Sequence, residues 1–596
     1  METILGIDLG TTNSEVAVIR DGKVEVLRED GAAILPSVVG LDAEGRLLVG
    51  TPARNQAVLA PERTVRSIKR RMGQAETVRL GDQQYTPQEI SAIILRALKE
   101  RAEKRLGRAL QKAVITVPAF FNETQREATR EAGHLAGLEV VRIINEPTAA
   151  SLAHDSHPEK LERLLVYDLG GGTFDVSVVQ IEQGVVEVLA SHGDTQLGGD
   201  DFDRALLERV CEDFAQQHGV DLRQSASACS RLLRAVEEAK ITLSCEAVAR
   251  IEEEYIAEKK GSPINLEREI TRAEYEELIE PLLSKTLVCV DQSLSDAKLN
   301  ARQIDKVILV GGASRTPLVS RLLQEQLSQP VHAEVDPELC VAMGAAIQAG
   351  LIAGIDVGPV LVDITPHTLG LEIFGELQGF PSVNCFSPVI HRNTPLPASR
   401  SEMYGTMVDS QEAAQIAIYQ GENRDTRHNQ FVGEFLLDEL AGVGRGNEIL
   451  VRFDLDLDGI LKVTATERTT GREKQLTVEN AISQFRRLDR EDARARVDAT
   501  FASCTEEAPP GDGPEDAGGK NATEDKLSDE LAQAVAKGKD LISRGKRIAP
   551  DAGPEDAAEI GQLIEKLQGA IQQRCQADIE QVATELEDLV FYLQDA

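Results

Sequence analysis

One phrase occurs twice in this chain, at residues 4–14 and again at residues 164–175. In each copy an apolar strand leads into an aspartate, Asp8 or Asp168, then into a turn rich in Gly and Thr, and then into a second strand. Backbone N–H groups in such turns can approach a phosphate closely, and the aspartate can hold a hydrated Mg²⁺. The repeat therefore predicts two similar lobes that clamp a nucleoside triphosphate between them.

The residues after each turn distinguish this pattern from commoner phosphate sites. Two strands follow around Asp21-Gly22 in the first copy and around Gln183-Gly184 in the second, which predicts two β-hairpins. A P-loop or a dinucleotide fingerprint would begin a helix here, and the chain contains no GxxxxGK[ST]. One copy alone could be a Gly-rich hairpin without a ligand, whereas the matched pair favours the clamp.

Charge and cysteine usage narrow the classes of partner and compartment. The chain has 64 basic and 99 acidic residues, a net charge of −35, which argues against nucleic acid or an anionic membrane as a partner. The first strand begins at about residue 3 and no apolar run reaches the ~18 residues of a membrane span, so we expect a cytoplasmic protein. The 8 cysteines lack CxxC spacing, which favours free thiols.

Changes in sequence pattern divide the chain into four segments. Residues 1–358 alternate strands and helices and predict an α/β domain. Residues 359–366 are apolar and fit either a linker that docks on another element or the first strand of the next domain. Residues 367–480 carry short alternating strands, which predicts an all-β sandwich. Residues 481–596 are helical and charged, with an acidic insert near 506–525 that we expect to be disordered.

Two helix starts and one helix face are explicit in the first segment. Thr86-Pro87-Gln88-Glu89 and the pair Asn122 and Gln125 have the spacing of capping boxes. Further on, Glu237, Lys240 and Ser244 share one face of a predicted helix. A buried strand that ends at Gly311-Gly312 could pack on adenosine. Alone, each of these is more often a solvated face or a plain turn than a ligand site.

The motifs resemble, in order, those of the seventy-kilodalton heat-shock chaperones, the DnaK family. They are GIDLGTTNS from residue 6, IKR at 68–70, AVITVPAFF at 113–121, NEPTAA at 145–150, YDLGGGTFD at 167–175 and VGG at 310–312. The match covers about residues 1–480, and the segment beyond 490 is similar only in being helical. The resemblance implies an actin-like two-lobed ATPase domain, a β-sandwich peptide-binding domain and a short helical lid.

The resemblance also assigns ATPase residues one by one. Phosphates would be held by Thr11, Thr12, Gly171, Gly172 and Thr173, and the nucleotide would also contact Gly10, Asn13, Gly170, Gly198 and Gly199. The waters of Mg²⁺ would be ordered by Asp8 and Asp168, and the hydrolytic site would be completed by Lys69, Glu146, Asp175 and Thr195. Adenosine and ribose would contact Glu237, Lys240, Ser244, Gly311, Gly312, Arg315 and Asp336. The implied cofactors are ATP or ADP, Mg²⁺ and K⁺.

Coupling and peptide-binding residues follow from the same resemblance. Pro118 and Arg126 match the family's switch pair, and Arg142 and Asp363 match residues that engage J-domain cochaperones. The cleft for extended peptides would be formed by Leu371, Phe374, Tyr404, Met407, Ala414 and Ile416. The implied partners of this monomer are unfolded or extended polypeptides, a J-domain cochaperone and a nucleotide exchange factor.

Some residues depart from the family pattern. The arch over the peptide is often Met with Ala, where this chain has Phe374 and Met407, and the central pocket residue, commonly Val, is Ala414. The Ala414 pocket is either wider or formed by a shifted strand. Residues 73–85 are fewer than in DnaK itself, which weakens the expectation of a DnaK-type exchange factor. The stretches 386–390 and 419–423 look most like the specialised bacterial HscC branch.

Two other functions are compatible with an actin-like fold. A small-molecule kinase would need a pocket for its phosphoacceptor, and an actin-like filament protein would need surfaces for assembly. Neither has a use for residues 367–596. The sequence therefore favours an ATP-dependent chaperone that binds and releases extended apolar segments, with slow ATP hydrolysis as its switch.

Overall fold

The structure of the protein is a computed structural model that describes residues 2–154, 160–328, 331–332, 336–457, 459–477, 487–502, 563–564 and 566. The chain divides into two compact units, Met1–Glu506 and Glu507–Ala596, and all elements below belong to the first. The acidic insert and the helices expected after residue 525 lie outside the described residues, apart from residues 563, 564 and 566.

A six-stranded sheet forms the first lobe, residues 2–154, with strand order β11-β10-β1-β2-β3 and with β4 paired to β2. Its strands are β1 (Ile4–Leu9), β2 (Asn13–Arg20), β3 (Lys23–Val26), β4 (Leu35–Pro36), β10 (Lys112–Val117) and β11 (Glu139–Asn145). Its helices are α1 (Thr51–Gln56), α2 (Pro87–Leu106), α3 (Glu123–Leu135) and α4 (Glu146–Leu152). Both predicted capping boxes are confirmed, at Thr86 before α2 and at Asn122 before α3.

A second six-stranded sheet, of order β18-β17-β12-β13-β14-β19, forms the second lobe, residues 160–352 with the edge strand β19. Its strands are β12 (Glu162–Leu169), β13 (Phe174–Glu182), β14 (Val185–Asp194), β17 (Lys306–Val310), β18 (Val331–His332) and β19 (Val360–Val362). Around it lie α5 (Gly199–His218), α6 (Ala226–Cys245), α7 (Arg272–Asp296), α8 (Pro317–Leu327) and the hairpin of β15 (Val248–Lys259) and β16 (Ser262–Thr271), and α9 (Cys340–Ile352) follows β18 in the chain. None of the described helices is long and apolar enough to span a membrane.

The two lobes repeat one plan, as the duplicated phrase predicts. Strand β1 pairs antiparallel with β2 and parallel with β10, and β12 pairs antiparallel with β13 and parallel with β17. Both predicted hairpin turns have two residues at positive φ, Asp21 and Gly22 in one and Gln183 and Gly184 in the other. This turn geometry matches the twist of the flanking strands, so the hairpins close without splaying.

Helix α9 packs against β1 and β2 of the first lobe and against α4. A Cβ on Gly6 of β1 would lie 2.1 Å from the backbone nitrogen of Ala346 in α9, so only glycine allows this approach. We expect Gly6→Ala to destabilise the first unit by about 1–3 kcal/mol, the usual cost of overpacking a core. Calorimetric unfolding checks this, with Gly442→Ala as the control because a Cβ there meets nothing within 4 Å.

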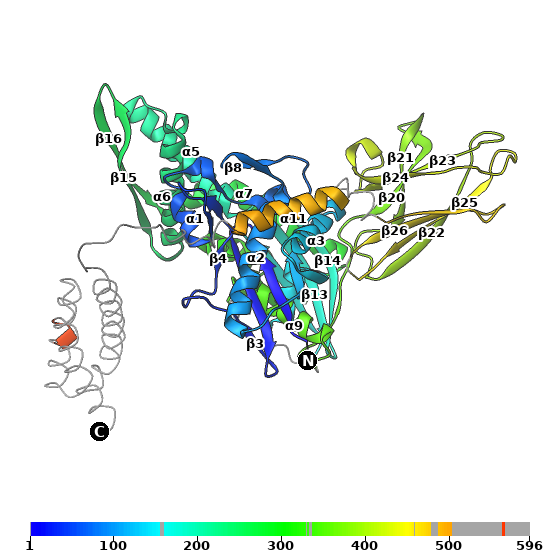
Figure 1. Ribbon diagram of the computed structural model, residues 1–596, viewed down its shortest axis with the longest axis horizontal. Helices are drawn as coiled ribbons and strands as arrows, with labels where there is room; N and C mark the ends of the chain where they lie inside the picture. The colour runs from blue at the N-terminus through cyan, green and yellow to red at the C-terminus, as the bar shows by residue number, and fades with distance from the viewer. Residues whose placement is uncertain are drawn as a thin grey trace, which may run out of the picture. The chain divides into compact units, whose positions relative to one another are not determined.

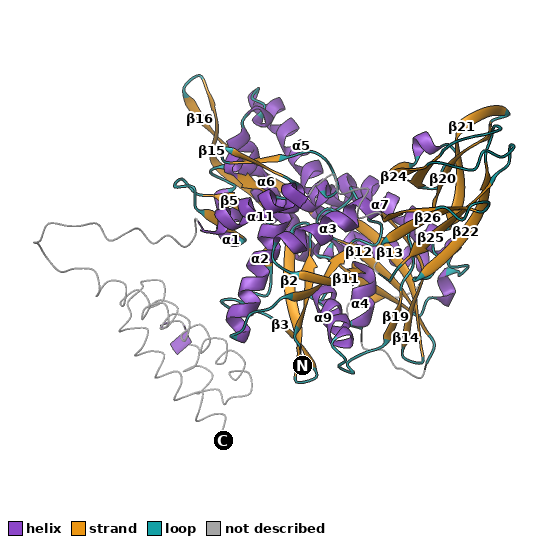
Figure 2. Cartoon of the chain, turned by 45° about the vertical axis from the view of Figure 1, so that its right-hand side comes forward, coloured by secondary structure: helices purple, strands orange, loops and turns teal. Residues whose placement is uncertain are grey.

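Two four-stranded antiparallel sheets follow, so the all-β expectation is confirmed (Figure 2). One sheet, of order β21-β20-β23-β24, contains β20 (Leu369–Leu377), β21 (Phe380–Ile390), β23 (Ala414–Gln420) and β24 (Gln430–Leu437). The other, of order β22-β25-β26-β27, contains β22 (Ala398–Gly405), β25 (Glu448–Leu455), β26 (Leu461–Glu467) and β27 (Glu473–Thr477). Buried side chains from both sheets form one apolar core, which makes this a sandwich.

The apolar segment before the sandwich docks on the second lobe. Strand β19 lies parallel to β14, with Val360 beside Val185, and Val360 N donates to Gly184 O at 2.9 Å. A few residues later Thr365 N donates to Thr394 O, which precedes the first strand of the second sandwich sheet. The two interpretations of residues 359–366 thus hold at different residues, because the chain pairs first with one domain and then with the other.

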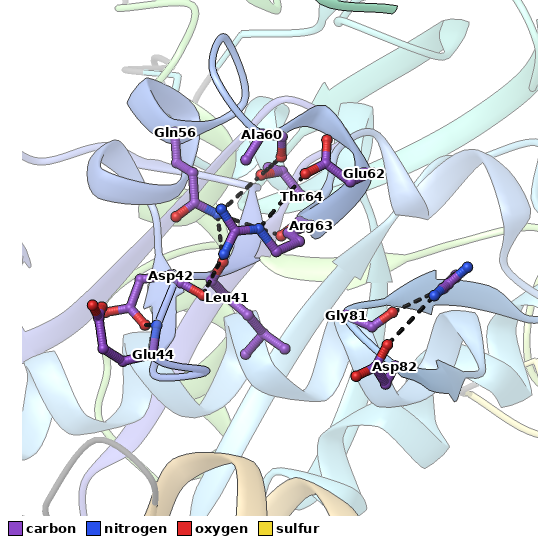
Figure 3. Close-up of polar contacts among 11 residues, drawn as sticks. Leu41, Asp42, Glu44, Gln56, Ala60, Glu62, Arg63, Thr64, Gly81 and Asp82 are labelled. Atoms are coloured by element: carbon purple, nitrogen blue, oxygen red, sulfur yellow. Dashed lines mark hydrogen bonds and ion pairs between the residues drawn. The ribbon is translucent and has the colours of Figure 1, made fainter.

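Small sheets and one late helix complete the first lobe. The short strands are β5 (Val39–Leu41), β6 (Leu47–Val49), β7 (Thr64–Val65), β8 (Val78–Leu80) and β9 (Gln83–Tyr85). Figure 3 shows how this region is tied together: Gln56 Nε2 donates to Leu41 O at 2.7 Å, and Arg63 donates to Asp42 O at 2.8 Å. Helix α11 (Arg487–Ala502) lies along α2 and α3 and adds Val497 to their core (Figure 1).

Candidate active site

The two Gly-rich turns line one cavity of about 280 Å³. Gly10, Thr11, Thr12 and Asn13 line it from the first lobe, and Gly170, Gly171 and Thr173 line it from the second. The turns lie so close that a Cβ on Gly171 would be 1.8 Å from Thr12 Oγ1. The Thr12 hydroxyl is buried without a hydrogen-bond partner among the described residues, so it is available to a ligand oxygen.

Of the residues predicted for Mg²⁺ and hydrolysis, three carboxylates and one lysine line this cavity, and a fourth carboxylate, Asp175, is buried without lining it. Asp8 is the last residue but one of β1, and Asp168 is the last residue but one of β12. The two copies of the phrase therefore place their aspartates at equivalent positions. Lys69 and Glu146 form a buried ion pair that also lines the cavity. Asp175 is buried beside them and accepts a hydrogen bond from the backbone of Phe120 at 2.9 Å.

The electrostatics of this cluster favour a cation. Burial, together with the nearby charge of Glu146, raises the pKa of Asp8 to about 7. Burial is also the main cause that holds the pKa values of Asp168 and Asp175 well above their ordinary range. A single lysine cannot compensate so many close carboxylates, and a hard cation with oxygen ligands can.

A hydrated Mg²⁺ fits this set of side chains. In the described part of the chain no three Asp, Glu, His or Cys side chains lie close enough to hold a metal ion directly. Asp8 is also held by a hydrogen bond from Thr116 Oγ1 at 2.7 Å, which orients its carboxylate. Mg²⁺ usually keeps several of its waters, so contact through water suits both the ion and these residues.

The other wall of the cavity comes from α6 and from the turn after β17. The predicted face of α6 is confirmed, since Glu237, Lys240 and Ser244 all line the cavity, as do Gly311 and Gly312. Gly311 has φ +79°, and a Cβ on it would lie 2.4 Å from Leu169 O. Glycine is therefore required at this turn, which lets the backbone pass close to the second lobe's central strand.

Five of the predicted residues lie outside the cavity wall: Gly172, Gly198, Asp175, Thr195 and Asp336. Gly172 and Gly198 pack directly behind the phosphate turns, where a Cβ on Gly198 would lie 2.5 Å from Gly172 N. Asp336 accepts a hydrogen bond from Arg315, which itself lines the cavity, at 3.0 Å. Gly172, Gly198 and Asp336 thus support the wall without forming it.

Thr195 lines a cavity other than the one between the Gly-rich turns. It lines a second cavity, together with Phe120, His367 and residues 420–423 of the sandwich. That cavity lies where the sandwich meets the first two lobes. Thr195 thus lines this second cavity and is absent from the wall of the first.

Four acidic residues of the cavity wall were not identified from the sequence: Glu15, Asp200, Asp203 and Glu338. Glu15 follows Asn13 by two positions in β2, so the period of a strand could have placed both on one face. Asp200 and Asp203 begin α5 directly after the predicted Gly199. Asp203 accepts a hydrogen bond from Lys240 at 2.7 Å, and burial raises its pKa to about 6.

Side chains from both lobes close the cavity. Arg66 of the first lobe forms an ion pair with Glu237 of the second at 3.0 Å, and Ser67 Oγ donates to Asp200 Oδ2 at 2.6 Å. A residue beyond them, Arg70, forms an ion pair with Asp201. These contacts join the two lobes beside the cavity.

Hydrogen bonds tie the residue that precedes Glu146 to the linker. Asn145, next to Glu146 in sequence, donates from Nδ2 to both carboxylate oxygens of Asp363, at 3.0 and 2.9 Å. Arg126 donates to Asn145 Oδ1 at 2.6 Å and also to the backbone oxygen of Ala119. Burial raises the pKa of Asp363. The carboxylate therefore depends on these donors, and the linker is tied to the active-site loop.

The other coupling residues lie on the same side of the first lobe. Pro118 directly follows β10, and its carbonyl accepts a hydrogen bond from Phe121 N at 3.1 Å. Arg142 lies in the edge strand β11, opposite Val114 of β10. His367, the first sandwich residue after the linker, contacts the carbonyl of Phe120 at 3.1 Å. The linker and the active-site loop thus meet at one surface.

The predicted peptide-binding residues divide into two groups. Leu371 and Ile416 belong to the sandwich core, and Tyr404 and Ala414 pack against it. The predicted arch residues are exposed: Phe374 has 50% and Met407 has 47% of its surface accessible. Exposed apolar side chains beside a rigid core are typical of a surface that binds another chain.

Comparison with known proteins identifies the family. The profile of the family described as "Hsp70 protein" matches residues 4–79 and 74–595. Chaperone protein DnaK of Thermotoga petrophila is 47% identical over 486 residues, which cover 80% of this chain and 80% of that protein. Chaperone protein DnaK of Thermosipho africanus is 46% identical over 485 residues, again 80% of each chain.

The matched length includes both lobes and the sandwich, and the small-molecule kinase alternative has no support. Members of this family are ATPases that use Mg²⁺ with their nucleotide, and they act on unfolded polypeptides with J-domain cochaperones. The chain therefore belongs to the Hsp70 family and is an ATP-dependent molecular chaperone.

Proposed function

We propose that the first cavity is the ATP site of this chaperone. We also propose that Asn145 and Asp363 couple the nucleotide bound there to the conformation of the sandwich. The observation that carries the proposal is the adjacency of Asn145 and Glu146. Glu146 lines the cavity and pairs with Lys69, whereas Asn145 binds both oxygens of Asp363 in the linker. If ATP binding shifts the segment that contains Asn145 and Glu146, the hydrogen bonds from Asn145 to Asp363 would therefore shift the linker as well.

The roles that we assign in hydrolysis follow from this arrangement. Asp8 and Asp168 would hold Mg²⁺ through water, and the ion would offset the charge of the phosphates. Lys69 positions the attacking water and stabilises charge on the γ-phosphate, while Glu146 orients the Lys69 ammonium. Phosphoryl transfer needs alignment and charge compensation above all, and these groups provide both. Asp175 and Thr195 complete the set, Asp175 from beneath the site and Thr195 from the neighbouring cavity.

The substrate that we assign to the sandwich is an extended apolar peptide. Residues 1–358 form the ATPase domain in this proposal, 359–366 the linker, 367–480 the peptide-binding domain and 481–596 the lid with its acidic insert. Phe374 and Met407 arch over the peptide, and Tyr404 and Ala414 face it from the core. An extended chain is held there by main-chain hydrogen bonds and by apolar side chains.

A peptide-binding titration tests this function. We expect an apolar, basic-flanked fluorescent peptide to bind the full chain without nucleotide and to bind at least about fivefold more weakly with ATP and Mg²⁺, within the usual range of coupling between two sites. Fluorescence anisotropy measures both affinities, and ADP in place of ATP is the control. Equal affinities with ATP and with ADP would contradict the proposed coupling.

Finer assignments rest on the sequence. K⁺ is a second proposed cation of the site, because the cavity wall is acidic, with Glu15, Asp200 and Glu338 added to the predicted carboxylates. The HscC-like character rests on residues 386–390 and 419–423, which lie in β21 and at the end of β23. We place Arg142 and Asp363 at the J-domain surface, with an exchange factor as a further partner.

The proposed cellular form is a cytoplasmic monomer that has no nucleic acid or membrane as partner. Two observations support it. The net charge of −35 disfavours binding to polyanions. The cysteines in the described part of the chain are free thiols, as expected of a reducing compartment.

A further inference from the structure

Glu15 places an additional carboxylate beside Asp8 in the nucleotide cavity. It lies in β2 directly opposite Asp8 of β1, and both residues line the cavity. Side chains directly opposite on antiparallel strands have Cβ atoms about 4.5–5.5 Å apart. The two carboxylates therefore share one face of the sheet at the bottom of the phosphate-binding turns.

The Glu15 carboxylate is buried and lacks a partner of its own. Only 2% of the residue is exposed, and its side chain forms no hydrogen bond or ion pair with any described residue. The charged groups that act on it are Asp8, Glu338, Asp336 and Arg101, three of them acidic.

Arg101, the one cation among these groups, is engaged elsewhere. It donates to Ala33 O at 3.0 Å and lies 3.5 Å from a carboxylate oxygen of Glu29. A buried carboxylate without its own counter-charge is costly unless a cation approaches it. Because Glu15 lines the cavity, a cation bound in the cavity can approach its carboxylate.

We propose that Glu15 is a cation-positioning residue of the nucleotide site, and that it acts through water with Asp8 on the divalent cation that accompanies the phosphates. This role rests on the proposed nucleotide site and goes beyond the residues assigned to Mg²⁺ above. Without the cation, Glu15 repels the phosphates. With the cation present, Glu15 instead attracts the cation that the phosphates bind. Glu15 therefore increases the extent to which nucleotide binding depends on the metal.

The experiment measures this dependence directly. Isothermal titration calorimetry gives the affinity of the full chain for ADP in Mg²⁺ and in EDTA, and the ratio of the two affinities measures the coupling between metal and nucleotide. We expect Glu15→Gln to lower this ratio about tenfold, since loss of a group that supports metal ligands commonly costs 10–100-fold in metal affinity. Glu15→Asp keeps the charge and should restore most of the ratio.

Glu29→Gln is the matched control, because it removes a carboxylate that also faces Arg101 but lies outside the cavity. Its ratio should equal that of the wild type. If the ratio of ADP affinities for Glu15→Gln equalled that of the wild type, the proposed role of Glu15 would be wrong, while the nucleotide site would stand. The same holds if the variant bound ADP more tightly by the same factor in Mg²⁺ and in EDTA. A wild-type chain that bound no ADP in Mg²⁺ would instead overturn the nucleotide site itself.

Discussion

Lys69→Ala should reduce the rate of ATP hydrolysis by about 10²–10³-fold, the usual loss when one group that stabilises transition-state charge is removed. Lys69 is only 3% exposed and forms an ion pair with Glu146 within the cavity. The orientation of its ammonium group is therefore fixed before ATP binds. Its attraction for the γ-phosphate grows as charge develops there, and ATP binding should therefore change little. Single-turnover hydrolysis and equilibrium binding of ATP measure the two effects separately.

The design must separate loss of catalysis from loss of the fold. Removal of Lys69 leaves the buried Glu146 carboxylate without its partner, which is destabilising. The double variant Lys69→Ala with Glu146→Gln removes that charge and should hydrolyse ATP as slowly as the single variant while unfolding at a temperature closer to the wild type. Lys104→Ala is the control, because that lysine is exposed and paired with Glu29 far from the cavity. An unchanged single-turnover rate in Lys69→Ala would show that the lysine has no part in hydrolysis.

Asp363→Ala should abolish the release of bound peptide on addition of ATP. The wild-type carboxylate accepts two hydrogen bonds from Asn145, which in turn accepts one from Arg126, and no alanine can replace them. The linker strand would lose its tie to the active-site loop, so peptide affinity with ATP should rise to the value found without nucleotide. Coupling of this kind commonly amounts to about 5–150-fold in affinity, and all of it should disappear. Fluorescence anisotropy with and without ATP measures the change.

Asp356→Ala is the matched control, because Asp356 is an exposed aspartate seven positions earlier in the same connection. It should release peptide with ATP as the wild type does. Asp363→Ala should also retain its basal ATPase activity, since Asp363 does not line the cavity. If ATP still released peptide from Asp363→Ala, the linker would couple the domains by another route.

Local patterns in the sequence predicted much of this structure. The capping boxes at Thr86 and Asn122, the hairpin turn at Asp21-Gly22 and the shared face of Glu237 and Lys240 all depend on residues a few positions apart. Such features are set by backbone preferences and helix or strand period, which do not depend on distant segments. The phosphate turns are local in the same way, because each consists of a strand end and a few consecutive Gly and Thr residues.

The prediction was incomplete where contacts join distant segments. Glu15 lines the cavity because β1 and β2 pair in one register, and Thr195 lies by the sandwich because β14 ends there. Asn145 reaches Asp363 across more than two hundred residues of sequence. No local pattern marks these residues, since long-range register and domain contact decide which side chains meet.

The amino-acid sequence by itself thus determined the two Gly-rich turns, the α/β and all-β classes of the first two domains and the family, because each depends on short motifs in a fixed order. Only the tertiary structure decided how the linker pairs with β14, how Asp363 meets Asn145 and which carboxylates line the cavity. Those outcomes depend on the packing of the lobes and the sandwich, where burial and charge act between residues that the chain keeps far apart.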